Sequence, residues 1–250
     1  MNRKKKYINS PLIGFLSFII LWQVVHLLLN THTIPSPMDT LLYALGIPKK
    51  LALHSISSIG RVGISVSVSL VLGIPIGMYL GVNKRANRIF SPLLYFIYPI
   101  PKVAFLPVFM LLFGLGNKSK IILIIWIIIF QIILSVRDGV LQVQPLYYKV
   151  MNGFGASKLE NIRFLLIPAI LPYIFSGLRV SIGISLATLF FAENYATTYG
   201  IGYFILTAWT KMNYVEMFSG ILVIGIIGVI LFHLIDCLEN YFTPWVKREN

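Results

Sequence analysis

Side chains that commonly carry chemistry are few in this sequence and lie far apart. The 250 residues include 8 Asp and Glu, 4 His and 1 Cys. Cys237 is alone, so an internal disulfide and a thiolate metal site are excluded. The chain also lacks the His/Asp/Glu or Ser/Lys grouping that an enzyme needs. The histidines, which show no spacing of metal ligands, are His26, His32, His54 and His233. We therefore expect no catalytic residue and no metal site.

A glycine-rich segment, GLGNKSK at residues 114–120, faintly resembles a phosphate-binding loop. It lacks the Gly-x-x-x-x-Gly-Lys-Ser/Thr spacing that surrounds nucleotide phosphates with backbone amides and a lysine. We interpret it as a short turn between helices. The chain is therefore expected to bind neither ATP nor any other cofactor.

A polar segment, GFGASKLENIRFLLIPAILPYI at residues 153–174, interrupts otherwise apolar sequence. Gly153 and Gly155 can adopt positive φ and end a preceding helix. Ser157 and Glu160 have the spacing of a capping box, which predicts that a new helix starts there. The segment therefore predicts a helix, a glycine elbow and a short second helix near the membrane surface. It is either an interfacial anchor or a docking site for a cytoplasmic partner.

Four further residues stand out inside apolar sequence. Pro101 and Pro107 lie in YPIPKVAFLPV, where proline would break a helix, so this stretch is a candidate pathway wall. Arg179 lies deep in an apolar run, and we expect it to face the protein interior or the pathway, preferably as a brace paired within the protein. Glu193 precedes a glycine-rich turn and is expected to be structural or gating.

The elements that position these residues are long apolar helices. The sequence is 57% hydrophobic and 12% charged, which suits a membrane protein rather than a soluble domain of this length. Spanning the hydrocarbon takes about 20 apolar residues. The pattern predicts a single all-α domain over residues 1–250 with six spans, at about 12–29, 62–82, 92–113, 119–136, 167–192 and 215–236, and a cytoplasmic loop at 137–166.

The net charge of +13 follows the topology of these helices. With the N-terminus inside, most Lys and Arg residues fall in cytoplasmic segments, as the positive-inside rule requires. The charge therefore predicts two cytoplasmic termini and contact with lipid, and it gives no reason to expect nucleic acid. The first apolar run is long and lacks a small-residue cleavage site, so we expect a retained helix rather than a signal peptide.

Three glycines of the second predicted span share one helix face. Gly73, Gly77 and Gly81 recur every four residues, which permits close helix approach. Packing within the chain is the preferred interpretation over a dimer contact.

These patterns together resemble the membrane subunits of binding-protein-dependent ABC importers, in their nitrate/sulfonate/taurine branch. GFGAS followed by IPAILPYIFSGLR is similar to the EAA loop of that family, with its glycine at Gly155 and its Leu-Pro at Leu171–Pro172. One departure is Lys149–Val150–Met151, which stands where the family has Glu-Ala-Ala. Further shared patterns, in order, are IPSP (34–37), SIGRV (58–62), GIPIGMYLG (73–81), PIPKVAFLPVFMLLFGLGNKSK (99–120) and AENYATTYGIG (192–202).

The resemblance implies a type I ABC-importer subunit in a bacterial-type plasma membrane. Its expected partners are a second permease copy, two cytoplasmic ATPase subunits that use ATP, and an extracytoplasmic solute-binding protein. The solute would be a small anion such as an aliphatic sulfonate, taurine or nitrate, with a thiamine-precursor-like pyrimidine as the alternative. The residues that the resemblance assigns to ATPase coupling are Gly153, Phe154, Gly155, Ala156, Ser157 and Glu160.

A stand-alone secondary transporter is a further alternative. It would need its own ion-coupling carboxylates within the membrane. Glu193 and Asp236 come nearest to that requirement, and both lie near predicted helix ends.

Overall fold

The computed structural model describes the backbone of residues 4–246 and the side chains of residues 13–246. Within these residues the chain is helical and contains no strand. The helices are α1 (Lys4–Leu29), α2 (Pro37–Gly46), α3 (Pro48–Val82), α4 (Lys84–Ile97), the 3₁₀ helix η1 (Lys102–Phe105), α5 (Leu106–Phe113), α6 (Asn117–Leu141), α7 (Pro145–Gly153), α8 (Lys158–Glu160), the π-helix η2 (Asn161–Leu166), α9 (Ile167–Glu193), α10 (Ile201–Thr210) and α11 (Tyr214–Phe242).

Four described helical segments are long and apolar enough to cross a membrane. They are Pro48–Val82, Asn117–Leu141, Lys158–Glu193 and Tyr214–Phe242. The bent pair Lys84–Ile97 and Lys102–Phe113 adds a fifth if it is counted as one span, and the apolar stretch Ile13–Leu29 of α1 is shorter. The all-helical membrane fold is confirmed, and the count of six spans stays a prediction.

The span predicted over 92–113 is broken into two helical parts, at the prolines where the sequence predicted a break. Its two halves, α4 and the η1–α5 segment, are bent by 84°. Pro101 occupies the N-cap of η1, and Pro107 lies in the first turn of α5. Because proline removes a backbone donor and clashes with the preceding turn, a continuous helix cannot pass through this stretch.

Other helix ends also lie beyond their predicted positions. The span predicted from 62 begins at Pro48, the one predicted over 119–136 runs to Leu141, and the one predicted over 215–236 runs to Phe242. The early start of α3 was hidden by His54, Arg61 and several serines, which resemble loop sequence but are buried by contacts from distant segments. Helices α2 and α10 were not among the predicted spans.

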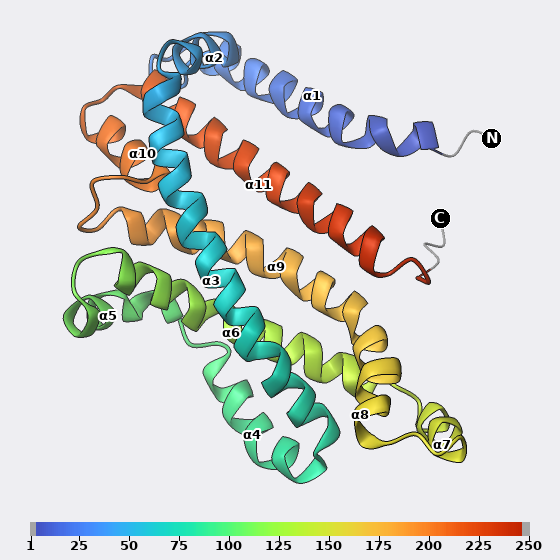
Figure 1. Ribbon diagram of the computed structural model, residues 1–250. Helices are drawn as coiled ribbons and strands as arrows, with labels where there is room; N and C mark the ends of the chain where they lie inside the picture. Colours follow the sequence, from blue (N-terminus) through green and yellow to red (C-terminus); the bar gives the residue numbers. More distant parts are fainter. Residues whose placement is uncertain (1–3, 247–250) are drawn as a thin grey trace.

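Helix α6 forms the centre of the bundle, between α3 and α9 (Figure 1). On α3, Gly73, Gly77 and Gly81 face it so closely that an added Cβ at Gly77 would lie 2.7 Å from the Ile133 carbonyl oxygen. A Cβ at Gly81 would lie 2.5 Å from Cβ of Val140. The prediction that this glycine face packs within the chain is confirmed.

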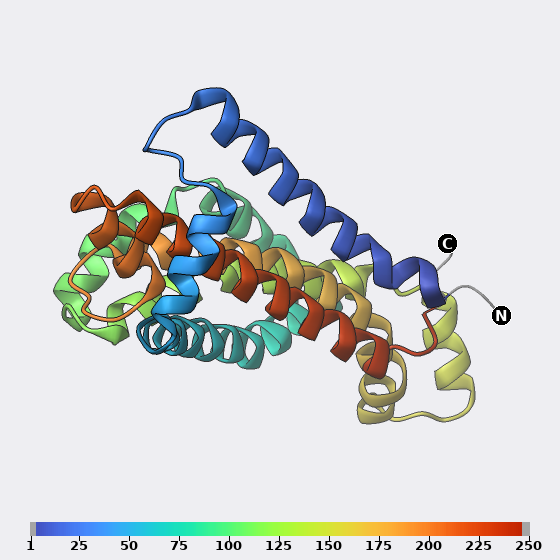
Figure 2. The same ribbon diagram turned by 90° about the horizontal axis from the view of Figure 1, so that it is seen from above.

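The two ends of the molecule carry different elements. Figures 1 and 2 show the start of α1, the end of α11 and the α7–α8 segment at one end, with α10 and the turn between α5 and α6 at the other. Helix α1 diverges from the rest of the bundle, as Figure 2 shows. We call the first end the elbow end and the second the α10 end.

Candidate functional site

The elbow between α7 and α8 is fixed by its own backbone and capping contacts. Gly155 has φ of +77°, as the sequence predicts, whereas Gly153 ends α7 without a positive φ. The amides of Gly155 and Ala156 donate to the carbonyls of Asn152 (3.0 Å) and Met151 (3.0 Å), closing the end of α7. Positive φ favours glycine because it has no Cβ to clash with the backbone.

The predicted capping box is formed on the other arm of the elbow. The Glu160 amide donates to Ser157 Oγ at 3.3 Å, and the Ser157 amide donates to Glu160 Oε2 at 2.7 Å. Asn161 joins the two arms, because its Nδ2 donates to Asn152 Oδ1 at 3.2 Å and to the Ser157 carbonyl at 3.1 Å. The role of Asn161 was missed, since a contact back to α7 leaves no local pattern.

The tip of the elbow projects into open space. Phe154 is 88% exposed, and Leu159 beside it is also exposed. The residues that replace Glu-Ala-Ala, Lys149–Val150–Met151, lie on α7 just before this tip. An exposed phenylalanine on a rigid turn is a typical anchor for a protein partner, because aromatic side chains dominate interface energies.

The second arm of the elbow continues directly into a spanning helix. Residues Lys158–Glu193 form one helical segment that includes the π-helix η2. Pro168 lies in the first turn of α9, and Pro172 lies inside it. A π-helical turn between α-helices often marks a functional position. A displacement of the elbow would therefore act directly on α9.

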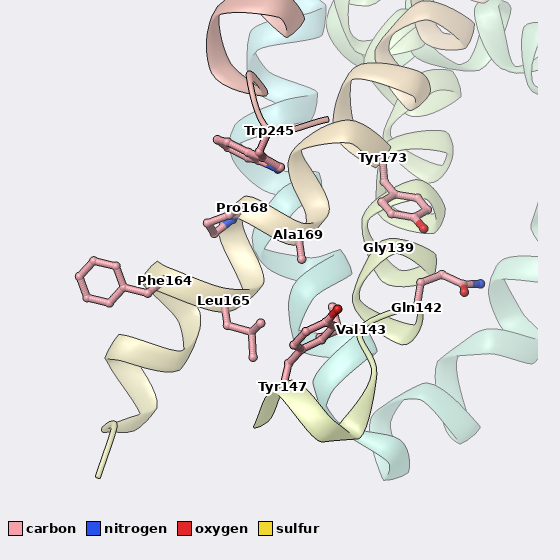
Figure 3. Close-up of a pocket in the computed structure, with 10 residues that line it drawn as sticks. All are labelled: Gly139, Gln142, Val143, Tyr147, Phe164, Leu165, Pro168, Ala169, Tyr173 and Trp245. Atoms are coloured by element: carbon pink, nitrogen blue, oxygen red, sulfur yellow. The ribbon is translucent and has the colours of Figure 1, made fainter. Parts of the chain in front are cut away.

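A hollow of about 340 Å³ separates the elbow from the bundle (Figure 3). The end of α6, Tyr147 of α7, the η2–α9 junction and Trp245 line it. The Tyr173 ring packs so close to Gly139 that an added Cβ there would lie 2.8 Å from it. Phe164 points away from Tyr147 and Tyr173 in this view. The residues that line the hollow are mostly apolar and lie between the elbow and the bundle.

Arg179 is paired within the protein, as a brace would be. Its Nε donates to Asp236 Oδ1 at 3.0 Å and its NH2 group donates to the same oxygen at 2.7 Å. Glu239 forms a second ion pair with Arg179. Both carboxylates lie in the last two turns of α11, so this cluster joins α9 to α11.

The bend between α4 and α5 exposes both candidate prolines. Pro101 and Pro107 are solvent-accessible in this single chain. Lys102 beside them is buried, with its Nζ 2.8 Å from the Tyr98 carbonyl and above the rings of Tyr98 and Phe130. Lys102 was not among the candidate residues predicted from the sequence.

Glu193 lies fully buried in a polar network at the α10 end. Its carboxylate accepts from Ser58 Oγ at 2.8 Å, from the Gly202 amide at 2.8 Å, and from Arg61, with which it forms an ion pair. Arg61 also donates to Asn117 Oδ1, from Nε at 3.0 Å and from NH2 at 2.8 Å. The network joins α3, α6, α9 and α10.

A histidine completes this network. His54 Nδ1 accepts from the Gly200 amide at 3.0 Å. Of these residues the sequence singled out only Glu193. Arg61 offered a signal, because it is a lone charge among the small residues in the first half of α3. His54 and Ser58 offered none, because their partners lie more than 130 positions away in the sequence.

Solved structures of similar fold include the MetNI methionine ABC transporter in inward-facing conformations. One chain matches with a TM-score of 0.66 at 17% identity, covering 81% of this chain and 99% of the other. At that identity the likeness supports the type I importer-like fold alone.

Relatives by sequence include two permease proteins. The taurine transport system permease protein TauC of Escherichia coli (strain K12) is 32% identical over 192 residues, which cover 77% of this chain and 70% of the relative. The bicarbonate transport system permease protein CmpB of Synechococcus elongatus is 30% identical over 253 residues, covering 95% and 87%.

The family model for the "binding-protein-dependent transport system inner membrane component" matches residues 73–248. This stretch includes the elbow, the α4–α5 bend, Arg179 and Glu193. The match, the apolar helices and the two permease relatives agree in describing a multi-pass membrane subunit. The chain therefore belongs to the family of binding-protein-dependent transport system inner membrane components, in its nitrate/sulfonate/taurine branch.

Proposed function

We propose that this permease subunit imports a small anion through an assembly of two permease copies, two cytoplasmic ATPase subunits and an extracytoplasmic binding protein. Two relatives are described as permeases for taurine and bicarbonate, which are small solutes with an anionic oxygen-bearing group. In this proposal ATP is bound and hydrolysed by the partner subunits. The permease provides the path and responds to their closure.

The observation that carries the proposal is the exposed Phe154 on an elbow that is continuous with α9. The coupling residues would be Gly153, Phe154, Gly155, Ala156, Ser157 and Glu160. Phe154 would insert into a groove of the ATPase, while Gly155 and the capping box hold the tip in shape. Closure of the ATPases would then move α8, η2 and α9 as one connected element.

The topology follows from the same proposal. The elbow, the start of α1 and the end of α11 lie at the same end of the molecule (Figure 1). We place this end in the cytoplasm, in agreement with the positive-inside rule. The α10 end then faces the binding protein.

The path itself would run beside the α4–α5 bend, between this chain and its second copy. Irregular backbone at membrane depth is tolerated where it contacts protein or lines a cavity. Pro101 and Pro107 are exposed at such a place in the single chain. Arg179 would brace the inner half of α9, and Glu193 would hold the outer end of the path closed.

The test is transport by the chain expressed with its ATPase and binding protein. Uptake of labelled taurine, nitrate, bicarbonate and a formylaminopyrimidine would be measured in the same cells. We expect saturable, ATP-dependent uptake of taurine, nitrate or bicarbonate. Uptake of the pyrimidine alone would overturn the assignment of the solute, and uptake without the ATPase would overturn the importer.

The elbow contact is tested by co-purification of the ATPase with the permease. Replacing Phe154 with Ala should weaken binding of the ATPase by roughly 10- to 100-fold, as expected for an aromatic anchor worth about 1–3 kcal/mol. Tyr241→Ala serves as the control, because Tyr241 is also an exposed aromatic residue and lies near the end of α11. Equal co-purification with both variants would contradict the proposed contact.

A further inference from the structure

A second hollow, also of about 340 Å³, lies at the α10 end. Its walls come from α3, from the first turn of α6 and from residues 196–199. The side chains with polar groups that line it are Ser57, Arg61, Asn117, Lys120, Thr197, Thr198 and Tyr199. Among its described lining residues there is no carboxylate.

The charges around this hollow do not balance. Arg61 and Lys120 are both buried, and Lys120 is only 1% exposed. The Glu193 carboxylate does not line the hollow, and it forms an ion pair with Arg61. Two positive charges and one negative charge leave a buried excess of one positive charge. Burying a charge without a counter-charge is strongly unfavourable, so the site favours an additional anion.

All the described hydrogen bonds of Lys120 go to uncharged backbone carbonyls. Its Nζ donates to the carbonyls of Leu115 (3.1 Å), Gly116 (3.3 Å) and Ala196 (3.1 Å). Carbonyl dipoles hold the Lys120 side chain in place at the wall of the hollow, but they supply no counter-charge.

The first turn of α6 adds to the positive potential. Asn117 begins this helix of 25 residues, and the N-cap is Gly116, which has no side chain to accept from the free amides. The N-terminus of a helix carries a partial positive charge that stabilises anions. The hydroxyl of Thr198 can donate to an oxygen atom, whereas those of Ser57 and Thr197 already donate to the carbonyls of Leu53 (3.1 Å) and Tyr195 (3.0 Å). Fixed charge, helix dipole and the Thr198 hydroxyl thus border one small space.

We infer that this hollow is a binding site for one small oxyanion, such as a sulfonate, nitrate or bicarbonate, at the outer face of the permease. The inference rests on the proposed function, which places the hollow on the outer side of the membrane and gives the class of solute. The volume suits a small ligand, since binding pockets span about 300–1,000 Å³. The anion would stop here on its way from the binding protein to the path. A lipid phosphate carries the same chemistry, and it is the second source that the experiment must separate.

The experiment measures anion binding to the purified full chain in phosphatidylcholine nanodiscs by calorimetry. Nitrate, bicarbonate and taurine are titrated at constant ionic strength. We expect saturable binding of at least one of them to the unaltered chain. Lys120→Met should weaken that binding by roughly 10- to 100-fold, because the buried positive charge that attracts the anion is lost. Lys118→Met is the matched control, since Lys118 lies on the same helical turn but does not line the hollow.

Thr198→Val provides a second variant in case Lys120→Met unfolds. Thr198 lines the hollow from an exposed position, so its loss should leave the fold intact and weaken binding several-fold. Absence of saturable binding in the unaltered chain would overturn the inference. Binding that is unchanged in folded Lys120→Met and Thr198→Val would also overturn it.

Nanodiscs that contain phosphatidylglycerol distinguish the two sources of the oxyanion. If lipid phosphate occupies the hollow, phosphatidylglycerol will compete with nitrate in the unaltered chain and not in Lys120→Met. If it does not compete, the site is reserved for soluble anions. If an anion binds but is not taken up by cells, the proposed transported solute is wrong and the binding site stands. If an anion is taken up but does not bind to the purified chain, the binding site is wrong and the proposed function stands.

Discussion

Arg61 of α3 and Glu193 of α9 form an ion pair across 132 positions of sequence, with side chains that are 7% and 0% exposed. The pair joins α3 to α9 at the α10 end, next to the hydrogen bonds that His54 and Ser58 accept from the amides of Gly200 and Ile201. The same carboxylate also accepts from the Gly202 amide at the start of α10. The position of α10 against α3 therefore depends on this charged contact together with the neutral hydrogen bonds around it.

Glu193→Gln should strongly destabilise this end of the permease. The amide can still accept from Ser58 and Gly202, but Arg61 is left buried without its counter-charge, at a cost of about 3–5 kcal/mol. Thermal unfolding in detergent measures the effect. The double variant Arg61→Met/Glu193→Gln should recover part of the loss, because it removes the orphaned charge. If Glu193→Gln left stability, uptake and binding-protein-stimulated ATPase activity unchanged, the gating role would be dropped.

A cation on α9 makes a second testable contact with α11. Arg179 pairs with Asp236, which is 46% exposed, and with Glu239, which is 14% exposed. Because solvent screens the more exposed carboxylate, Glu239→Gln should lower the melting temperature more than Asp236→Asn. Arg179→Met should lower it at least as much as Glu239→Gln. The reverse order of the two acidic variants would show that burial does not govern this cluster.

Glycine packing between α3 and α6 gives a matched pair of substitutions. An added methyl group at Gly77 meets the Ile133 carbonyl oxygen and Val136, whereas one at Gly60 of the same helix has nothing within 4 Å. Gly77→Ala should therefore destabilise the chain by about 1–3 kcal/mol through overpacking. Gly60→Ala should be neutral or slightly stabilising in the single chain. Equal melting temperatures for the two variants would contradict the packing described here.

Local features of the fold were readable from the sequence. The positive φ of Gly155 and the capping box of Ser157 and Glu160 each follow from residue types within a few positions. Such features depend on backbone sterics and on hydrogen bonds between near neighbours. The spacing of Gly73, Gly77 and Gly81 likewise predicted a close helix approach, although the helix that packs there, α6, is distant in sequence.

Features that depend on distant partners were not readable. Helix α3 begins at Pro48, and the polar residues His54 and Arg61 in its first half are buried because they contact Gly200 and Glu193. The prolines near residue 101 predicted a weak point, but the 84° bend follows from how α5 packs on α6. The excess positive charge near Lys120 is likewise visible only once α3, α6 and α9 are brought together.

Topology can be tested with single cysteines in a Cys237→Ser background, since Cys237 is exposed and would react. Ser157→Cys reports on the elbow end and Lys118→Cys on the opposite end. A membrane-impermeant maleimide applied to intact cells should label Lys118→Cys only. Labelling of Ser157→Cys from outside would reverse the proposed orientation.

Gly155 provides the sharpest test of the elbow. In the single chain an added Cβ at Gly155 meets nothing within 4 Å, so the space around it is free and only its φ of +77° resists substitution. A β-branched residue at such an angle costs about 1–3 kcal/mol of backbone strain. Gly155→Val should therefore leave the permease in the membrane but abolish uptake, with the ATPase lost from the purified complex.

Asparagine at the same position separates strain from docking. Asn tolerates positive φ better than other non-glycine residues, so Gly155→Asn keeps the shape of the elbow while adding a side chain to its tip. If the tip lies in a groove of the ATPase, Gly155→Asn should also lose most of the bound ATPase, because packed interfaces tolerate added atoms poorly. Gly60→Ala, which adds a methyl group to a helical position with open space and lies on α3, outside the elbow, should behave like the unaltered chain. Normal uptake by both Gly155 variants would leave the elbow as a membrane anchor with no part in coupling.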